Sequence, residues 1–203
     1  KLSCRSELLR RRSELIFEIR KHFYSMGFFE VDTPSLVCSP GMEPHIRPIQ
    51  VLTGSQYAPT FLPTSPEFAM KKVLAEGHFE KIFQVCKAYR SEPPSTTHSP
   101  EFTILEWYRT HSNFEKIMDD VEDLFVALCR RFYGSTEFTT KGFGLQSVAK
   151  PWVKLTVEEC FRNYANLELT SLFDLKKMYS ACEKLGLVRS SYSDQLWDDL
   201  FFL

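Results

Sequence analysis

Apolar residues recur every three or four positions in several stretches of the chain, which is the spacing of one face of a helix. The clearest case is residues 5–26, where leucine, isoleucine and phenylalanine fall on one side and arginine and lysine mostly on the other. Elsewhere apolar and polar residues alternate, as they do in a half-buried strand. We predict helices at residues 5–26, 66–76, 113–132, 156–165, 171–186 and 193–203, and strands at 28–32, 81–90, 101–108 and 152–155.

The order of these elements favours a fold with hairpin-linked strands. A loop with three prolines separates residues 81–90 from 101–108, so the second stretch is typical of the returning strand of a long hairpin. Strands and helices do not alternate as they do in βαβ units. A proline-rich loop is expected at 38–48 and a polar linker near 134–150. We therefore predict an α+β fold, an antiparallel sheet flanked by helices.

Two of the predicted helices begin with capping signals. Ser65 is a good N-cap, Pro66 suits the first helical position, and Glu67 favours the positive end of the helix dipole. Thr156 and Glu159 have the spacing of a capping box. Glu67 therefore has two interpretations, as a first-turn dipole residue or as part of a site.

Charge and cysteine content narrow the class of protein. The formal net charge is −1, so no overall field favours nucleic acid, and a large tRNA footprint is not expected. None of the six cysteines has a second cysteine or a histidine at zinc-site spacing, which favours buried thiols in a reducing compartment. There is no signal peptide and no apolar run long enough to cross a membrane. A cytoplasmic location is expected.

Two further features of the sequence are its ends and the spacing of its glycines. The chain starts at Lys1 rather than at a methionine and stops on the apolar run 201–203, so we expect further sequence after Leu203. Neither G-x-G-x-x-G nor G-x-x-x-x-G-K-[ST] occurs. Any nucleotide phosphates must therefore be held without a glycine-rich loop.

Unusual polar residues occupy the predicted hairpin between Tyr89 and Tyr108. Alternate residues of a strand share a face, so Arg90 and Glu92 should point the same way. The same rule groups Phe102, Glu106 and Tyr108 on the returning strand. Buried carboxylates need partners. The surface is therefore either a solvated hairpin face or a site for a cationic ligand, and the pattern alone leaves both open.

The sequence of this hairpin resembles motif 2 of the class II aminoacyl-tRNA synthetases, a strand with R-x-E, a loop, and a strand with H-x-P-E-F. Here the matching residues are R-S-E at 90–92 and H-S-P-E-F at 98–102. Upstream, G-F at 27–28 followed by Val31, Thr33 and Pro34 is similar to motif 1, the helix and strand that form the family's dimer interface. Between them, S-P-E at 65–67 with M-K at 70–71 resembles the amino-acid-binding helix of the lysyl branch.

Within that branch the sequence looks more like the elongation factor P lysine ligases, which attach (R)-β-lysine to a lysine side chain of that factor. The stretches that favour them are P-G-M-E-P-H at 40–45, S-P-E at 65–67 and L-E-W-Y-R at 105–109. The resemblance implies ATP and lysine or (R)-β-lysine as substrates, elongation factor P as acceptor, and a homodimer. Two alternatives are a catalytic-core fragment of a lysyl-tRNA synthetase and a non-catalytic paralogue acting as a binding or regulatory subunit.

The resemblance also implies roles for individual residues. Arg90 is the expected catalytic residue and would contact the α-phosphate of ATP and the substrate carboxylate. The ATP-binding set is Arg90, Ser91, Glu92, His98, Ser99 and Phe102, with Phe102 stacking on adenine. The set that would bind the amino acid is Ser65, Pro66, Glu67, Glu106 and Tyr108. His98 could also be an ordinary loop histidine, and Glu106 with Tyr108 could form one structural hydrogen bond.

One part of the family pattern is missing. Motif 3, a glycine-rich strand and helix with an adenine-covering arginine and acidic metal ligands, has no counterpart after Asn113. We therefore interpret residues 1–203 as an incomplete class II catalytic domain, with 134–203 as a mainly helical insertion region. The resemblance implies Mg²⁺ as a cofactor, with its protein ligands outside the given chain.

Overall fold

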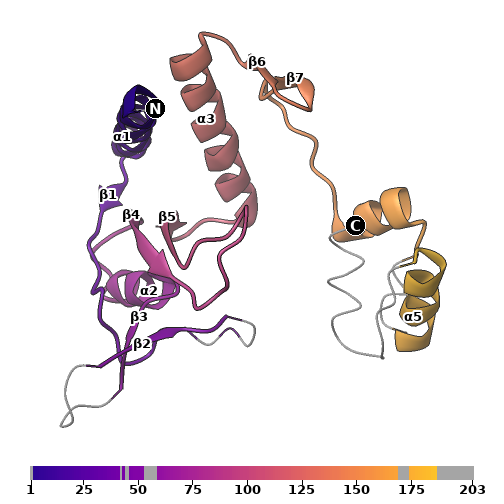
Figure 1. Ribbon diagram of the computed structural model, residues 1–203, viewed down its shortest axis with the longest axis horizontal. Helices are drawn as coiled ribbons and strands as arrows, with labels where there is room; N and C mark the ends of the chain where they lie inside the picture. The colour runs from indigo at the N-terminus through magenta and orange to yellow at the C-terminus, as the bar shows by residue number, and fades with distance from the viewer. Residues whose placement is uncertain (1, 42, 44–45, 53–58, 169–173, 187–203) are drawn as a thin grey trace. The chain divides into compact units, whose positions relative to one another are not determined.

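The computed structural model describes residues 2–41, 43, 46–52, 59–168 and 174–186. Its contacts divide the chain into two compact units, Lys1–Lys150 and Pro151–Leu203 (Figure 1). The first unit contains helices α1 (Leu2–Ser25), α2 (Glu67–Ala75) and α3 (Phe114–Tyr133) and strands β1 (Phe29–Glu30), β2 (Ile49–Val51), β3 (Thr60–Leu62), β4 (Lys81–Tyr89), β5 (Glu101–Arg109), β6 (Glu137–Thr140) and β7 (Gly144–Ser147). The predicted α+β fold class is confirmed.

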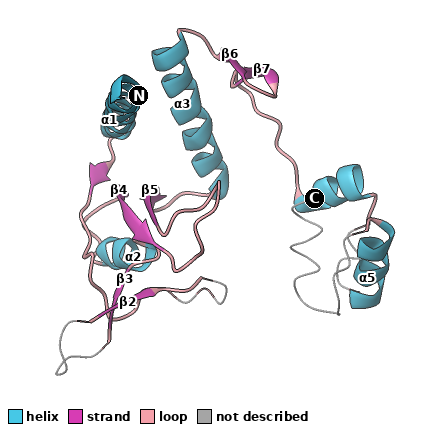
Figure 2. Cartoon of the chain, in the orientation of Figure 1, coloured by secondary structure: helices cyan, strands magenta, loops and turns pink. Residues whose placement is uncertain are grey.

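The β4–β5 hairpin is the centre of the first unit (Figure 2). Its strands pair antiparallel from Lys81↔Arg109 to Tyr89↔Glu101, and β1 adds to β4 in parallel. The sheet order is therefore β1-β4-β5, while β2 pairs with β3 and β6 with β7 in separate two-stranded sheets. Because this register continues without interruption, it determines which side chains of the two strands share each face of the hairpin.

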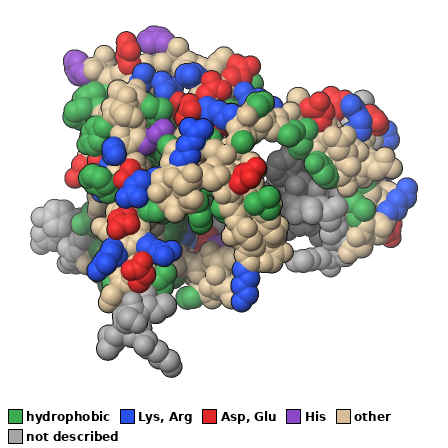
Figure 3. Space-filling view, turned by 90° about the horizontal axis from the view of Figure 1, so that it is seen from above, with side chains coloured by type: hydrophobic (Ala, Val, Ile, Leu, Met, Phe, Trp, Pro, Cys, Tyr) green, Lys and Arg blue, Asp and Glu red, His purple; other side chains and the backbone are tan. Residues whose placement is uncertain are grey.

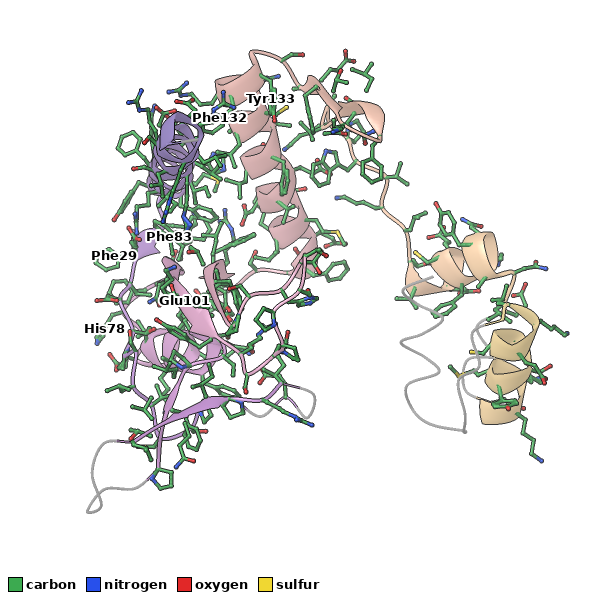
Figure 4. All side chains as sticks on the ribbon, in the orientation of Figure 1. Phe29, His78, Phe83, Glu101, Phe132 and Tyr133 are labelled. Carbon is green, nitrogen blue, oxygen red and sulfur yellow. The ribbon has the colours of Figure 1, made fainter. Side chains whose placement is uncertain are left out.

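One face of this sheet packs against α1 and α3. Phe23, Phe28, Phe83 and Leu124 form a buried cluster, and Trp107 of β5 packs against it. The Phe23 ring stacks on Phe83 with centroids 4.9 Å apart, and Phe83, labelled in Figure 4, belongs to the side of β4 that faces α1. Each fully buried ring contributes about 1.5–3 kcal/mol of transfer free energy. Phenylalanine rings are therefore a main component of this core cluster.

The opposite face of the sheet packs against α2. A second cluster joins Val31, Met70 and Ile82, with Tyr108 of β5 packed against it. Because α2 is a short helix, it covers the hairpin at the Ile82–Tyr108 row. The rows toward Tyr89 extend beyond this cluster, and they form the candidate site described below.

A buried ion pair joins β5 to α3. Arg109 Nε lies 2.6 Å from Asp120 Oδ2, and Arg109 Nη2 lies 2.7 Å from Asp120 Oδ1. The two side chains are only 10% and 2% exposed. The guanidinium also lies 4.6 Å from the centroid of the Phe28 ring. This two-pronged contact fixes the start of α3 against the end of the hairpin.

The second unit is helical in its described part. It contains α4 (Val157–Cys160), the π-helix η1 (Phe161–Ala165) and α5 (Leu175–Lys184). Thr156 accepts from the backbone N–H of Glu159 while Glu159 accepts from that of Thr156, which confirms the predicted capping box. Asn166 ends η1 in the left-handed conformation, where asparagine is tolerated.

Several sequence predictions need correction. The linker expected near 134–150 contains the β6–β7 hairpin, and no strand occurs at 152–155. The strand expected at 28–32 shrinks to Phe29–Glu30. The pair β2–β3 was not predicted, and the helix expected at 193–203 lies outside the described residues. Among the residues that the structure describes, no helix is long and apolar enough to cross a bilayer.

Candidate functional site

The candidate site is the face of the β4–β5 hairpin that points away from the Phe23–Phe83 core. Its rows are fixed by the strand register, in which Ala88 pairs with Phe102, Gln84 with Glu106, and Ile82 with Tyr108. The predicted common face of Phe102, Glu106 and Tyr108 is confirmed by this alternation. Polar and aromatic groups of both strands therefore form one continuous floor.

Arg90 lies at one end of this floor. β4 ends at Tyr89, but the backbone N–H of Arg90 still donates to Pro100 O at 3.0 Å, so the ladder continues by one residue. The Ser91 N–H donates to Arg47 O at 2.7 Å. The guanidinium carbon of Arg90 lies 5.0 Å from the centroid of the Phe102 ring. Backbone contacts on both sides and an aromatic platform thus hold the side chain in place.

One N–H group of the Arg90 guanidinium has no acceptor among the described residues. Within the described part of the chain, Arg90 Nε is buried and has no hydrogen-bond partner. Such a group costs free energy unless a ligand supplies an acceptor. A planar guanidinium suits carboxylate and phosphate oxygens in particular. The geometry at this end therefore fits an anion.

Acidic groups gather toward the other end of the floor. The Tyr108 hydroxyl donates to Glu106 Oε2 at 3.0 Å. Burial raises the pKa of Tyr108, and the negative charges of Glu106 and Glu67 raise it further. The phenol therefore stays protonated and remains a donor to Glu106 at any physiological pH.

Glu67 reaches this end from the first turn of α2. Its backbone N–H donates to Ser65 Oγ at 3.0 Å, and the N-cap residue is Pro66 rather than the predicted Ser65. Pro66 already has helix-like dihedral angles, so the helix begins one residue later than predicted. The Ser65 hydroxyl accepts from the backbone N–H two residues further along the chain. The Glu67 carboxylate lies 2.5 Å from Lys71 Nζ, and that ammonium is 6.0 Å from the Tyr108 ring centroid. A cation thus already lies beside both groups.

The loop between the strands is less closely tied to the floor. The hydrogen bonds of His98 stay within its own loop, to Ser95 and Thr97, so the structure does not bring it to Arg90. Ser99 is exposed in the same loop. Glu92 donates from its backbone to Arg90 O at 2.8 Å, a tight turn that ends the strand. The expectation that Arg90 and Glu92 share a strand face is therefore wrong, and their ATP-binding roles stay predictions.

Three residues of this region were not assigned a role from sequence. Gln84 lies opposite Glu106, Cys86 follows it on the same face, and Lys71 pairs with Glu67. Strand alternation would have selected Gln84 and Cys86, because they share the parity of Arg90. The spacing of four residues between Glu67 and Lys71 is the ordinary signal of a helical ion pair.

Cys86 is expected to be a poorly reactive thiol. Burial, with the nearby charges of Glu106 and Asp32, raises its pKa to about 11. Because the thiolate is the nucleophile, alkylation of Cys86 at pH 8 should be slow, whereas the exposed Cys38 should react readily. Peptide mapping after timed iodoacetamide treatment measures both rates. Equal labelling of the two cysteines would contradict this environment for Cys86.

Metal binding is not supported by the described residues. Among them, no three His, Cys, Asp or Glu side chains are grouped as a metal site. Glu67 and Glu106 are the carboxylates of this end of the floor, and they share it with Lys71 and the Tyr108 hydroxyl. A divalent cation is therefore not assigned to these described residues.

Positive and negative side chains are mixed on the surface of this chain that Figure 3 shows. In the view of Figure 3, basic and acidic side chains are interspersed rather than segregated. This agrees with the net charge of −1. The local separation of charge along the hairpin floor is therefore the more specific feature for recognition.

Comparison with known proteins agrees with these features. Residues 3–194 match the family described as tRNA synthetases class II (D, K and N). A lysine–tRNA ligase of Pseudomonas aeruginosa is 34% identical over 177 residues, which is 86% of this chain and 34% of that protein. The lysine–tRNA ligase 2 of Methanosarcina mazei is 33% identical over 174 residues, 85% of this chain and 34% of that protein. The chain thus spans about a third of the length of these relatives.

Proposed function

Because this chain belongs to the class II tRNA synthetases of the D, K and N group, we propose that it activates a lysine-type amino acid with ATP on the floor of the β4–β5 hairpin. The observation that supports this most is the separation of charge along one sheet face. The Arg90 Nε, which has no partner among the described residues, lies at one end. The carboxylates of Glu106 and of Glu67, the latter paired with Lys71, lie toward the other. Lysine has the matching polarity, with a carboxylate and a distant ammonium.

The two ends of the floor are several strand residues apart. Arg90 is opposite Pro100 and Glu106 follows six residues later. At about 3.3 Å per strand residue this is roughly 20 Å between backbone positions. A lysine-type amino acid and the α-phosphate of a nucleotide would both lie along this length.

The chemistry assigned to the protein is mainly positioning and charge stabilisation. A carboxylate oxygen of the amino acid attacks the α-phosphorus of ATP, the bond to the bridging oxygen breaks, and pyrophosphate leaves. Arg90 would hold both the carboxylate and the α-phosphate, because its donors match both groups in one plane. An acceptor nucleophile then attacks the acyl carbon, and AMP leaves. Holding the reactants in line lowers the barrier without a covalent protein intermediate.

Removal of one negative charge tests the end of the floor that is proposed to bind the substrate ammonium. Replacing Glu106 with glutamine keeps its size but removes the carboxylate that accepts from Tyr108. We expect the KM for the lysine-type substrate to rise by about 10-fold or more, because a hydrogen bond to a charged group is lost from a partly buried site. The KM for ATP should change little. Amino-acid-dependent exchange of pyrophosphate into ATP measures both constants.

Glu101→Gln is the matched control for this variant. Glu101 is on the same strand, but it is exposed and pairs with Lys87 at 2.6 Å, outside the proposed site. Its KM values should equal those of the parent protein. A lysine KM unchanged in Glu106→Gln, or a preference for norleucine over lysine in the parent protein, would contradict the proposed ammonium site.

The molecule that accepts the activated acyl group is a further part of the proposed function. We propose that the acyl group passes to a lysine of elongation factor P, which the resemblance at residues 40–45 and 105–109 supports. The alternative is tRNA, as the names of the relatives suggest for those proteins. Incubation of the full-length protein with labelled lysine or (R)-β-lysine, ATP and each acceptor separates the two. Label on tRNA alone would replace the first acceptor by the second, and label on neither would favour a non-catalytic paralogue.

A homodimer is proposed on the similarity of residues 27–34 to motif 1. The α1 helix before this stretch has large exposed apolar side chains, among them Leu8, Leu9 and Phe17. Such side chains on one helix favour a protein contact over free exposure. Light scattering on the full-length protein should give twice the chain mass, and a monomer would contradict the proposal.

A further inference from the structure

Gln84 is a buried polar residue within the candidate site. Its side chain is only 3% exposed, although its neighbours on the same strand face are Ile82 and Cys86. An amide buried among such groups costs free energy unless it is hydrogen-bonded. Gln84 Oε1 accepts from the Thr33 hydroxyl at 3.0 Å, which satisfies the carbonyl end. The structure records no hydrogen bond from the amide nitrogen among the described residues.

The residue directly opposite Gln84 is Glu106. The two are cross-strand partners on the face that contains Arg90, Phe102 and Tyr108. Directly opposed residues of an antiparallel pair have Cβ atoms about 5 Å apart, so the side chains are within reach of each other. Because the Thr33 hydroxyl donates to the carbonyl oxygen, the N–H₂ group of Gln84 remains as a donor, and it can only donate.

We propose that Gln84 is a positioning residue whose amide donates to the Glu106 carboxylate and holds it for the substrate ammonium. Glu106 then lies between two neutral donors, the Gln84 amide and the Tyr108 hydroxyl. Thr33 holds the Gln84 amide in its orientation, so the chain of contacts runs from Thr33 through Gln84 to Glu106. This inference rests on the proposed function, since it assigns Gln84 a role in binding the lysine-type substrate.

The neutrality of Gln84 is important for this role. A lysine or arginine opposite Glu106 would orient the carboxylate equally well but would cancel its charge. A neutral amide restricts the carboxylate and leaves its charge available to a cation. Two donors fixed before binding also reduce the ordering cost when the ligand enters. Gln84 therefore affects which amino acid binds, through Glu106, without touching ATP.

The test compares Gln84→Met with the parent full-length protein in lysine-dependent pyrophosphate exchange. Methionine fills a similar volume and has no donor. We expect the KM for the lysine-type substrate to rise by about 10-fold, as for one hydrogen bond to a charged group, while kcat and the KM for ATP stay within about 2-fold. Glu101→Gln is the matched control, because Glu101 lies outside the proposed site and should leave all three constants unchanged.

Thr33→Val provides a second, milder variant. It removes only the hydroxyl that holds the Gln84 carbonyl, so the lysine KM should rise less than in Gln84→Met, with the ATP KM again unchanged. This variant decides the question if Gln84→Met does not fold. An unchanged lysine KM in both variants, or an equal rise of the lysine and ATP KM values, would overturn the role of Gln84. Absence of exchange by the parent protein with any lysine-type substrate would instead overturn the proposed function and, with it, this inference.

Discussion

Replacing Arg90 with alanine is expected to lower kcat/KM for amino-acid-dependent pyrophosphate exchange by about 10²–10³-fold, the usual cost of losing one donor to developing charge. The expectation rests on the geometry of the guanidinium. Its Nε is buried without a partner in the described residues, and its plane lies over Phe102. The group is therefore held in place before the substrate arrives. Its loss should lower kcat more than it raises the KM for ATP.

The Arg90→Lys variant tests whether the planar shape of the guanidinium is needed in addition to its positive charge. Lysine keeps the positive charge but has no planar fork, so it cannot bind a carboxylate and a phosphate together. We expect it to recover only a small part of the lost rate. Circular dichroism should show that both variants remain folded. Activity of Arg90→Ala within a few-fold of the parent would remove Arg90 from the reaction.

Replacing Asp120 with alanine is expected to lower the free energy of unfolding by about 3–5 kcal/mol. Asp120 is 2% exposed, and both its oxygens accept from Arg109, itself 10% exposed. Removing one partner of such a buried pair leaves the other charge uncompensated. Because the contact joins β5 to α3, the loss should be felt across the first unit. Denaturant unfolding followed by circular dichroism measures the change.

Asp119→Ala is the control for this stability effect. Asp119 is the preceding residue of α3, its side chain is 43% exposed, and its contact with Lys116 is 3.5 Å long. Exposed pairs of this kind contribute about 1 kcal/mol or less. If the two variants were equally stable, the Arg109–Asp120 pair would not be an important link between hairpin and helix.

The sequence predicted the hairpin and its site face well, for a physical reason. Side-chain alternation on a strand has a strict period of two, so the common face of Phe102, Glu106 and Tyr108 followed once the strand was identified. The same rule failed at Glu92. A backbone turn from Arg90 to Glu92 ends the strand one residue earlier than the pattern suggested. Such a turn depends on local hydrogen bonds that residue type does not encode strongly.

Other features could not be obtained from pattern alone. The β6–β7 hairpin has short strands and mostly polar or exposed side chains, so it has the composition of a linker. Its turn contains Gly142 and is followed by Gly144, both with a positive φ, and these two glycines are the local signals of a hairpin in that stretch. Strand alternation places Gln84 on the face of Arg90, but alternation alone does not show which residue of the next strand lies opposite it. Its importance depends on the register that places it opposite Glu106.

The hydrogen bonds of His98 also differ from what the motif implied. A position within a motif predicts that a residue belongs to a site, but its orientation depends on the loop around it. Here Ser95 and Thr97 bind the ring nitrogen and hold His98 within a local turn. For the same reason the ammonium of Lys71, which the motif includes without a role, lies beside Glu67. Local contacts within a loop and within one helix turn decide both cases.

The most direct test of the central claim is pyrophosphate exchange into ATP by the full-length protein with single amino acids. We expect exchange with lysine or (R)-β-lysine, and at least 10-fold less with norleucine, which has the same chain but no terminal ammonium. Exchange should fall in Arg90→Ala and should require both ATP and the amino acid. Exchange that is equal for lysine and norleucine, or absent with every lysine-type substrate, would contradict the assignment of the hairpin floor as a lysine-activating site.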